Sequence, residues 1–194
     1  MSRKEVILET ARKLFNETNT QAVTTNHIAK EMGISPGNLH YHYKNREEII
    51  RKLYLRLKEE MSLAIEELPK SIEALNEHEK LLIEVQWKYR FFFKEILFLF
   101  SRDSELEAMY IKDNLAHKMR ITQVMKNLQE NKELNIPDEA VLDFLVNSVL
   151  LSWQFYNSHL HTLGEEVNSS SAHKVIEYTN AAMRPYIQSK NSNF

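Results

Sequence analysis

Residues 28–43 read IAKEMGISPGNLHYHY, and this short stretch decides the fold of the N-terminal part of the chain. The apolar residues from Ile28 onward follow a helical spacing that stops at Gly33, a residue that often ends helices because it adopts left-handed backbone angles without strain. Ser35 is a favourable N-cap, and Pro36 follows at the first helical position, where its missing N–H costs nothing. Two short helices joined in this way predict a helix-turn-helix, whose second helix enters the major groove of DNA.

Helical spacing of apolar residues extends along the rest of the chain. A first helix with Ile7, Ala11, Leu14 and Phe15 on its apolar face is expected to end near Thr18, and Thr24 is a good N-cap for the second. A fourth helix is expected over Arg46–Leu68, ending before Pro69, which makes it about 35 Å long at 1.5 Å per residue. Further helices are expected over residues 72–100 (with a break in the aromatic run), 104–132, 138–163 and 171–188. No stretch alternates as a strand does, so the predicted fold class is all-α.

The composition excludes several classes of protein. The 194 residues include no Cys, which rules out disulfides, thiolate nucleophiles and Cys-based zinc sites. No run is long and apolar enough to span a membrane, and the N-terminus has no signal-peptide core, so a cytoplasmic protein without membrane association is expected. The net charge is -2, yet residues 1–58 carry 11 Lys and Arg against 6 Asp and Glu. A basic end on an acidic body is typical of a phosphate-binding module joined to a module that does not bind nucleic acid.

The stretch quoted above resembles the DNA-binding signature of the TetR/AcrR repressors, and the resemblance runs from about Ile7 to Tyr54. It implies a helix-turn-helix domain of three helices over residues 1–60, followed over residues 61–194 by a larger helical domain that binds a small molecule and dimerises. Three positions depart from the family pattern: His40 stands in place of the usual Tyr, Asn19 in place of Gly, and His27 in place of an acid.

Residues in and around the predicted third helix are suited to contact DNA. Gly37 lets the backbone approach the groove floor, and Asn38 offers a donor and an acceptor to a base edge. The resemblance matches Arg46 to a phosphate-contacting Lys of the family. The predicted DNA-binding residues are Thr24, Thr25, His27, Ser35, Pro36, Gly37, Asn38, His40, Tyr41, His42, Lys44 and Arg46. His40 and His42 can equally be ordinary surface residues, and at i and i+2 they point to different faces, so no metal site is expected.

An effector pocket is predicted in the larger domain, because seven of the 19 aromatic residues fall between Trp87 and Phe100. In the family, the C-terminal helices bind a small molecule, and pockets for such molecules are lined by apolar and aromatic side chains with few polar groups. The candidate pocket residues are Trp87, Arg90, Phe91, Phe98, Tyr110, His117 and Gln154. The alternative for each aromatic ring is a place in the ordinary core.

A homodimer interface is predicted on the helix over residues 138–163, which is apolar on more than one face. A helix that is apolar nearly all round is buried on several sides, and in a short chain the additional partner is a second copy. Leu145, Val149 and Trp153 lie on one stripe and are the predicted contact residues. With the last helix they would form the four-helix interface that the family resemblance implies.

The predicted function is that of a sequence-specific DNA-binding regulator, a repressor that a small apolar effector releases from a palindromic operator. The alternative is a DNA-binding protein of the same fold without an effector. An enzyme is not expected, because the chain has no Gly-rich phosphate loop, no pair of His residues at helical i and i+4, and no recognisable Ser/His/Asp pattern. No cofactor is expected. The predicted partners are double-stranded DNA, a second copy of the chain and the effector.

Overall fold

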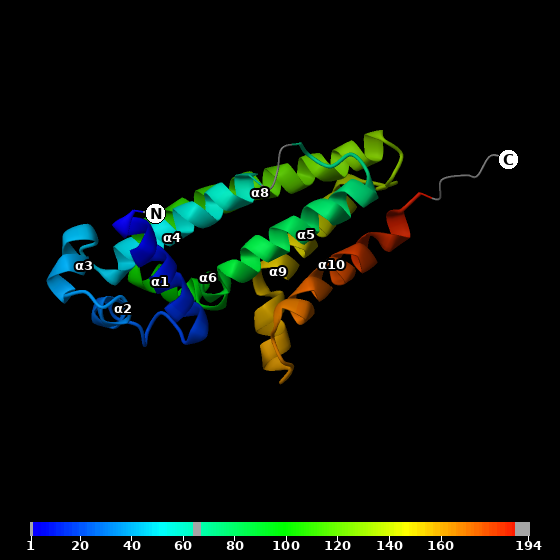
Figure 1. The fold of residues 1–194 in the computed structure, drawn as a ribbon. Coiled ribbons are helices and arrows are strands. Elements are labelled where there is room, and N and C mark those ends of the chain that lie inside the picture. Colours follow the sequence, from blue (N-terminus) through cyan, green and yellow to red (C-terminus); the bar gives the residue numbers. More distant parts are fainter. Residues whose placement is uncertain (1, 64–66, 189–194) are drawn as a thin grey trace. The chain divides into compact units, whose positions relative to one another are not determined.

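The regular structure of this chain is helical, which confirms the predicted all-α class. The computed structural model describes residues 2–63 and 67–188, and in these ranges the only strand-like feature is an isolated bridge between Leu134 and Ile187. Figure 1 shows the order of the helices along the chain. By contacts between residues, the chain divides into two compact units.

The first compact unit, unit 1, holds the helix-turn-helix. It comprises Met1–Met61 together with Lys88–Met109. Its first helices are α1 (Arg3–Glu17), α2 (Thr25–Glu31), α3 (Pro36–His42) and α4 (Arg46–Leu63), and α1, α2 and α3 group around the beginning of α4 in Figure 1. The expected extension of α4 to Leu68 is wrong, because the chain already bends at Glu67 and Leu68 is not helical. A residue before proline is disfavoured in helical angles, and Pro69 follows directly.

The aromatic run breaks into short helices, as its sequence predicts. Residues 72–102 form α5 (Ile72–Lys88), α6 (Arg90–Lys94) and α7 (Ile96–Arg102). The junctions are Tyr89 and Glu95, whose ψ angles of 28° and 15° depart from helical values, and neither caps the next helix with its side chain. The segment after the first break packs into unit 1, although the boundary expected at residues 60 and 61 does not assign it there.

The core of unit 1 joins the helix-turn-helix to the aromatic segment. The ring centroids of Phe15 and Phe91 are 5.3 Å apart, and Phe92 stacks on Tyr54 at 5.1 Å. Burying one such ring contributes roughly 1.5–3 kcal/mol. Buried apolar residues of this unit are Ile7, Leu8, Ala11, Phe15, Ile28, Ala29, Leu39, Ile49, Ile50, Leu53, Phe91, Phe92, Ile96 and Leu99. The helix-turn-helix therefore depends on residues 90–99 for part of its core.

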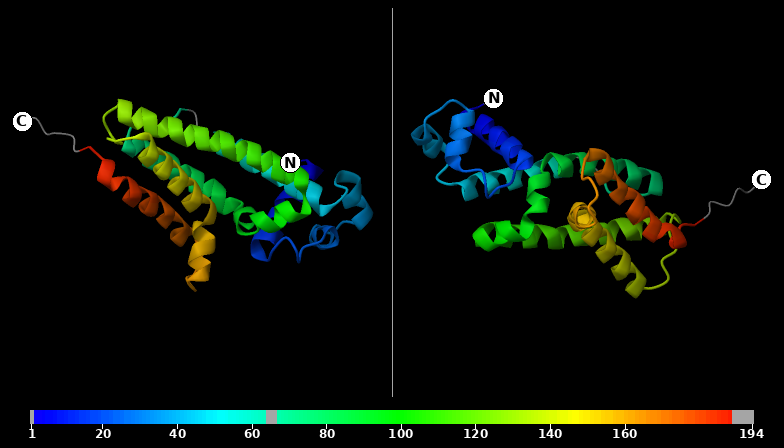
Figure 2. Two further views of the ribbon diagram at one scale, coloured as in Figure 1. Left: turned by 180° about the vertical axis from the view of Figure 1, so that it is seen from behind. Right: turned by 90° about the horizontal axis from the view of Figure 1, so that it is seen from below.

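The second compact unit, unit 2, comprises Ser62–Trp87 and Tyr110–Phe194. It contains most of α5, the larger part of α8 (Ser104–Glu130), and α9 (Glu139–Thr162), α10 (Ser169–Met183) and the 3-10 turn η1 (Arg184–Tyr186). α9 and α10 run side by side in Figures 1 and 2. One buried cluster gathers around Leu128, Leu145 and Val146, and a smaller one joins Ile83 of α5 to Val175 and Ile176 of α10.

Candidate nucleic-acid interface

The turn between α2 and α3 has the geometry that its sequence predicts. Gly33 has a φ of +64°, in the left-handed region that favours glycine, and it ends α2 with a hydrogen bond from its N–H to the Lys30 carbonyl. The Ile34 N–H donates to the Ala29 carbonyl at 3.0 Å. The Ser35 hydroxyl then accepts from the Asn38 N–H at 3.2 Å and caps α3. These local bonds set the direction in which α3 leaves the turn.

The beginning of α3 presents an open surface. Ser35, Pro36, Gly37 and Asn38 are all exposed, whereas Leu39 is fully buried and anchors the helix. A Cβ added at Gly37 would meet nothing within 4 Å, and its φ lies outside the left-handed region. The fold itself therefore does not require glycine at this position. A bare backbone there leaves room for another molecule to approach closely.

The predicted DNA-binding residues fall into two groups by exposure. Those that are exposed are Thr24, His27, Ser35, Pro36, Gly37, Asn38, His40, Tyr41 and Lys44, and Tyr41 is 86% exposed. Those that are half-buried are Thr25, His42 and Arg46. Tyr41 and His42 stand edge to face, with ring centroids 5.2 Å apart. The structure thus brings most of the predicted set to the surface of α2, α3 and the following loop.

Two histidines that depart from the resemblance make local hydrogen bonds. Nδ1 of His27 lies 3.3 Å from the backbone nitrogen of Thr24, from which it accepts in the capping box of α2 when it carries no proton. The Ala22 carbonyl lies 3.0 Å from the same nitrogen, which can donate to it only in the other tautomer. Nδ1 of His40 lies 3.1 Å from the Lys44 carbonyl. Because a carbonyl only accepts, this hydrogen bond requires a proton on Nδ1 of His40.

Lys44 and Arg46 have different surroundings although both are cations near α3. The Arg46 guanidinium donates to the Thr20 carbonyl at 2.7 Å and to Glu47 at 3.2 Å, and its side chain is only 19% exposed. Lys44 is exposed, and its backbone N–H donates to Glu48 at 2.7 Å. Arg46 therefore ties the start of α4 to the loop after α1, while the Lys44 ammonium lies at the surface.

Sequence reasoning missed the residues that attach α6 and α7 to the helix-turn-helix. The Lys88 carbonyl accepts hydrogen bonds from Arg12 at 2.7 Å and from Asn16 at 2.8 Å. Glu95 accepts from the backbone N–H and the hydroxyl of Thr20. Further along, Arg51 of α4 holds Asp103 through both carboxylate oxygens at 2.9 and 2.8 Å. The sequence shows polar residues within the first helix. It does not show which residues they bind, because their partners lie more than 50 positions away.

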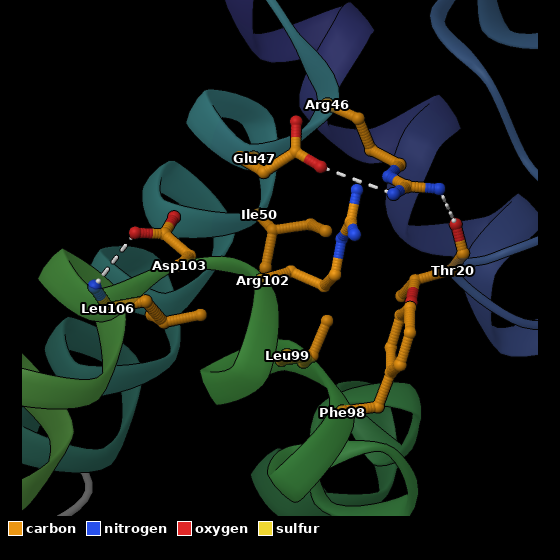
Figure 3. A pocket seen from close by; sticks show the side chains of 9 residues that line it. All are labelled: Thr20, Arg46, Glu47, Ile50, Phe98, Leu99, Arg102, Asp103 and Leu106. Carbon is orange, nitrogen blue, oxygen red and sulfur yellow. Dashed lines mark hydrogen bonds and ion pairs between the residues drawn. The ribbon is translucent and has the colours of Figure 1, made fainter.

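A shallow hollow lies in unit 1 beside these contacts. Its volume of about 240 Å³ includes open solvent, and it is lined by Thr20, Arg46, Glu47, Ile50, Phe98, Leu99, Arg102, Asp103 and Leu106. Figure 3 shows Phe98 and Leu99 on one side of it and, on the other, Arg46 bonded to Thr20 and Glu47. Sites for drug-sized ligands enclose about 300–1,000 Å³, whereas part of the volume of this hollow is open solvent, so it does not enclose such a ligand.

Comparison with known families decides the identity of the chain. A family model described as "Bacterial transcriptional repressor", the TetR model, matches residues 47–193. A second, described as "Bacterial regulatory proteins, tetR family", matches residues 7–53. The chain belongs to the TetR family of bacterial transcriptional regulators. The predicted family and its DNA-binding helix-turn-helix are confirmed.

Individual relatives are more distant. The negative transcriptional regulator IcaR of the icaADBC biofilm operon of Staphylococcus epidermidis is 28% identical over 127 residues, which cover 66% of this chain and 62% of IcaR. The regulator HbdR of an Aromatoleum species is 30% identical over 87 residues, 45% of this chain and 37% of HbdR. These matches span less than two thirds of either relative's own length.

Solved structures share the fold over nearly the whole chain. A TetR-family regulator from Marinobacter aquaeolei VT8 superposes with a TM-score of 0.88 at 24% identity, covering 97% of this chain and 92% of the other. The ketosteroid transcriptional regulator KstR2 of Mycobacterium tuberculosis gives a TM-score of 0.69 at 18% identity, covering 97% and 96%. At these identities the likeness concerns the fold.

The candidate effector residues of this TetR-family chain divide between the two units. Arg90, Phe91 and Phe98 belong to unit 1, where Phe91 is 2% exposed in the core and Phe98 lines the hollow of Figure 3. Tyr89, Phe91 and Phe92 are thus core residues of unit 1, whereas Phe93, Phe98 and Phe100 are half-buried. The candidates in unit 2 are Trp87, Tyr110, His117 and Gln154.

Three of the candidates in unit 2, Tyr110, His117 and Gln154, are half-buried side chains with polar groups. Gln154 of α9 donates to the Asn114 side chain of α8 at 2.6 Å. Burial raises the pKa of Tyr110 to about 12, against a smaller opposing effect of its hydrogen bond with Gln154. Burial lowers the pKa of His117 to about 4, with the nearby charges of Arg120 and His78 acting in the same direction. At neutral pH both side chains are therefore uncharged.

The apolar stripe predicted to form the dimer interface lies inside the chain. Leu145 is fully buried, Val149 is 8% exposed, and both belong to the core cluster of unit 2, with Trp153 packed against it. This burial does not fit the predicted contact role of Leu145 and Val149. The exposed large apolar residues of α9 are Phe144, Leu151 and Phe155, and α10 adds Tyr178.

The described residues contain neither a helix that could span a membrane nor a cluster that could hold a metal ion. Within residues 2–63 and 67–188, no helix combines the length and the apolar character needed to cross a membrane. In the same ranges, no three acidic or histidine side chains come together in a way that could hold a metal ion.

Proposed function

We propose that this TetR-family chain is a dimeric repressor that binds a two-fold symmetric DNA site through α2 and α3, and that a small apolar effector bound in unit 2 releases it. The observation that carries the DNA-binding part is the exposed start of α3, where Gly37 has open space and Asn38 is exposed. A regulator needs its base-reading groups in this place, at the N-terminal end of the second helix of the motif.

The exposed side chains have distinct parts in DNA recognition. The Asn38 amide pairs a donor with an acceptor and matches the edge of adenine in the major groove. Tyr41 and Thr24, which are exposed, and His42, which is half-exposed, contact phosphate or sugar and set the register. Lys44 contributes a cation to the phosphate backbone, whereas Arg46 is engaged with protein groups.

Dimerisation uses the exposed apolar side of α9 with α10. Phe144, Leu151 and Phe155 are spaced by seven and four residues and so share one helical stripe. They are exposed by 61%, 61% and 37%, and Tyr178 of α10 by 60%. A second copy that covers this stripe removes its apolar surface from water. Two copies then present their α3 helices about one helical turn of DNA apart, roughly 34 Å.

Release by an effector is supported by the half-buried polar side chains Tyr110, His117 and Gln154 of unit 2 and by one structural neighbour. KstR2 is a ketosteroid transcriptional regulator, and its fold covers 97% of this chain. A hundredfold loss of DNA affinity requires the effector to prefer the released state by about 2.8 kcal/mol. A regulator of the same fold that has no effector is the competing candidate.

Selection of binding sites from random DNA tests the DNA-binding part. Wild-type protein is expected to enrich a two-fold symmetric consensus. The Asn38→Ala variant should lose preference at one position of each half-site by roughly 1–3 kcal/mol, because it removes a bidentate base contact. Lys44→Ala is the matched control and should weaken all sequences alike. A consensus that Asn38→Ala leaves unchanged contradicts the assignment of base reading to Asn38, and enrichment of no symmetric sequence overturns the proposal.

A further inference from the structure

The interior of unit 2 holds a carboxyl group that the DNA-binding function does not use. The buried face of α5 is formed by Leu75, Glu79, Leu82, Ile83 and Gln86. Glu79 is 5% exposed and lies on this face between apolar residues. Acidic side chains are almost never buried unless they are paired, so Glu79 needs a physical reason.

Two buried oxygen atoms in unit 2 lack a hydrogen-bond partner. They are Oε2 of Glu79 and Oδ1 of Asn180, and in the described part of the chain no other fully buried side-chain nitrogen or oxygen is in this state. The Asn180 amide of α10 donates to Asn76 of α5 at 2.7 Å. Asn76 and Glu79 are three residues apart on one helix, and residues with this spacing are neighbours on its surface. Glu79 therefore lies on α5 next to the residue that accepts the hydrogen bond from Asn180 of α10.

Other polar side chains inside unit 2 are satisfied. Gln86 donates to the Trp153 carbonyl, and the buried Thr179 hydroxyl bonds to the carbonyls of Val175 and Ile176 in its own helix. A buried polar atom without a partner is unfavourable, and in natural proteins it calls for a specific explanation such as a bound group. The unsatisfied atoms are thus confined to Glu79 and Asn180 within the described residues.

The chemistry of these atoms selects the class of ligand. An amide oxygen only accepts hydrogen bonds, and an ionised carboxylate likewise only accepts. A ligand that satisfies the Asn180 oxygen and an ionised Glu79 must supply N–H or O–H donors, and a protonated amine supplies up to three together with the charge that stabilises the carboxylate. Apolar neighbours on α5 and α10, among them Ile83 and Ile176, suit the apolar body of such a ligand.

We propose that unit 2 binds an apolar molecule carrying a protonated amine, whose N–H groups are held by Glu79 and Asn180. This inference rests on the proposed effector function and names the effector's class. The ammonium stays protonated when it binds, while the Glu79 carboxyl gives its proton to solvent and forms an ion pair with it. Burial raises the pKa of Glu79 to about 8, so the free protein carries that proton at neutral pH. Binding therefore releases close to one proton per ligand.

Calorimetry with the full chain tests this assignment without DNA. The probes are primary n-alkylamines from butylamine to dodecylamine, each compared with the alcohol of the same chain length. Titration at pH 7 in phosphate and in Tris, which differ in ionisation enthalpy, measures the protons released. The wild type should bind an amine at least tenfold more tightly than its alcohol, a difference of about 1.4 kcal/mol, and release close to one proton.

Two variants and a control complete the test. Glu79→Gln keeps the shape and neutral state of the side chain, so the protein should fold, lose the preference for the amine and release no proton. Asn180→Ala should weaken amine binding and keep the proton release. Glu73→Gln, an exposed acid of the same helix, should behave as wild type.

Equal affinity for amine and alcohol, an amine preference that survives in Glu79→Gln, or the failure of every amine to bind at millimolar concentration would overturn the inference. The selection experiment with DNA is independent of these measurements. A failure of the amine-binding inference can therefore be distinguished from a failure of the DNA-binding proposal.

Discussion

Replacing Arg46 with Ala is expected to destabilise the fold and to leave the salt dependence of DNA binding unchanged, whereas Lys44→Ala is expected to do the reverse. The Arg46 guanidinium donates to the Thr20 carbonyl at 2.7 Å and to Glu47 at 3.2 Å with 19% of its side chain exposed. Hydrogen bonds that involve a charged group contribute about 1.5–3 kcal/mol each. A loss of about 2–3 kcal/mol lowers the apparent Tm by roughly 4–12 °C in a chain of this size.

For Lys44 the expected change concerns the counterions of DNA. Each phosphate neutralised by a cation contributes about -0.9 to the slope of log affinity against log salt concentration. A dimer presents two Lys44 side chains, so Lys44→Ala should reduce the magnitude of the slope by roughly 1.8. The Tm should stay unchanged, since the Lys44 side chain is exposed.

Two measurements separate these roles. Thermal unfolding followed by far-UV circular dichroism reports stability, and fluorescence anisotropy with a selected DNA site at several KCl concentrations reports the slope. Binding is measured well below the Tm of both variants. Lys126→Ala, which removes an exposed cation from unit 2, should change neither quantity. An Arg46→Ala protein with wild-type Tm and a reduced slope would refute the structural role of Arg46. It would indicate instead that Arg46 contacts a phosphate.

Three further outcomes are expected. Gly37→Ala should raise the free energy of unfolding by up to about 1 kcal/mol, because Ala favours helix. The same variant should weaken DNA binding in an anisotropy titration. An unchanged DNA affinity would show that the backbone at Gly37 does not approach DNA closely. Leu151→Glu should turn dimers into monomers in sedimentation analysis, while Leu81→Glu, at a comparable exposure of 56% on α5, should not; a dimeric Leu151→Glu protein would place the interface elsewhere. Glu79 has a pKa raised from 4.5 to about 8, so its folded state favours the protonated form and stability is lost as pH rises from 4.5 through 8. Chemical denaturation should show Glu79→Gln gaining on the wild type by roughly 3 kcal/mol at pH 7 and by almost nothing at pH 4, and a gain independent of pH would contradict the burial of an ionisable group.

Local signals in the sequence were sufficient for the helix-turn-helix. Ser35, Pro36 and Gly33 act through bonds within a few residues of themselves, and the structure places each in its expected conformation. The end of α4 was less predictable, because the apolar spacing continues to Leu68 although the chain bends at Glu67. Periodicity reports which face of a helix is apolar and does not report where the chain leaves the helix.

The roles of apolar and charged side chains could be read only in part. Phe91 has the same character whether it lines a ligand pocket or fills a core, and its contact with Phe15 joins residues 76 positions apart. Along α9, apolar residues lie on several faces, so the sequence could not distinguish the buried Leu145 from the exposed Leu151. Arg46 has the charge of a phosphate ligand, but its partners include backbone carbonyls from the loop after α1.

The sequence by itself determined the family, the all-α class, the helix-turn-helix and the residues at the beginning of α3. These features depend on capping, turn geometry and local spacing, which act between neighbours in the chain. The tertiary structure decided that the aromatic segment stabilises the DNA-binding unit, that the stripe through Leu145 faces inward, and that Glu79 is enclosed without a partner for one oxygen. Such properties depend on which distant segments meet, because burial and hydrogen bonding are set by neighbours in space rather than in sequence.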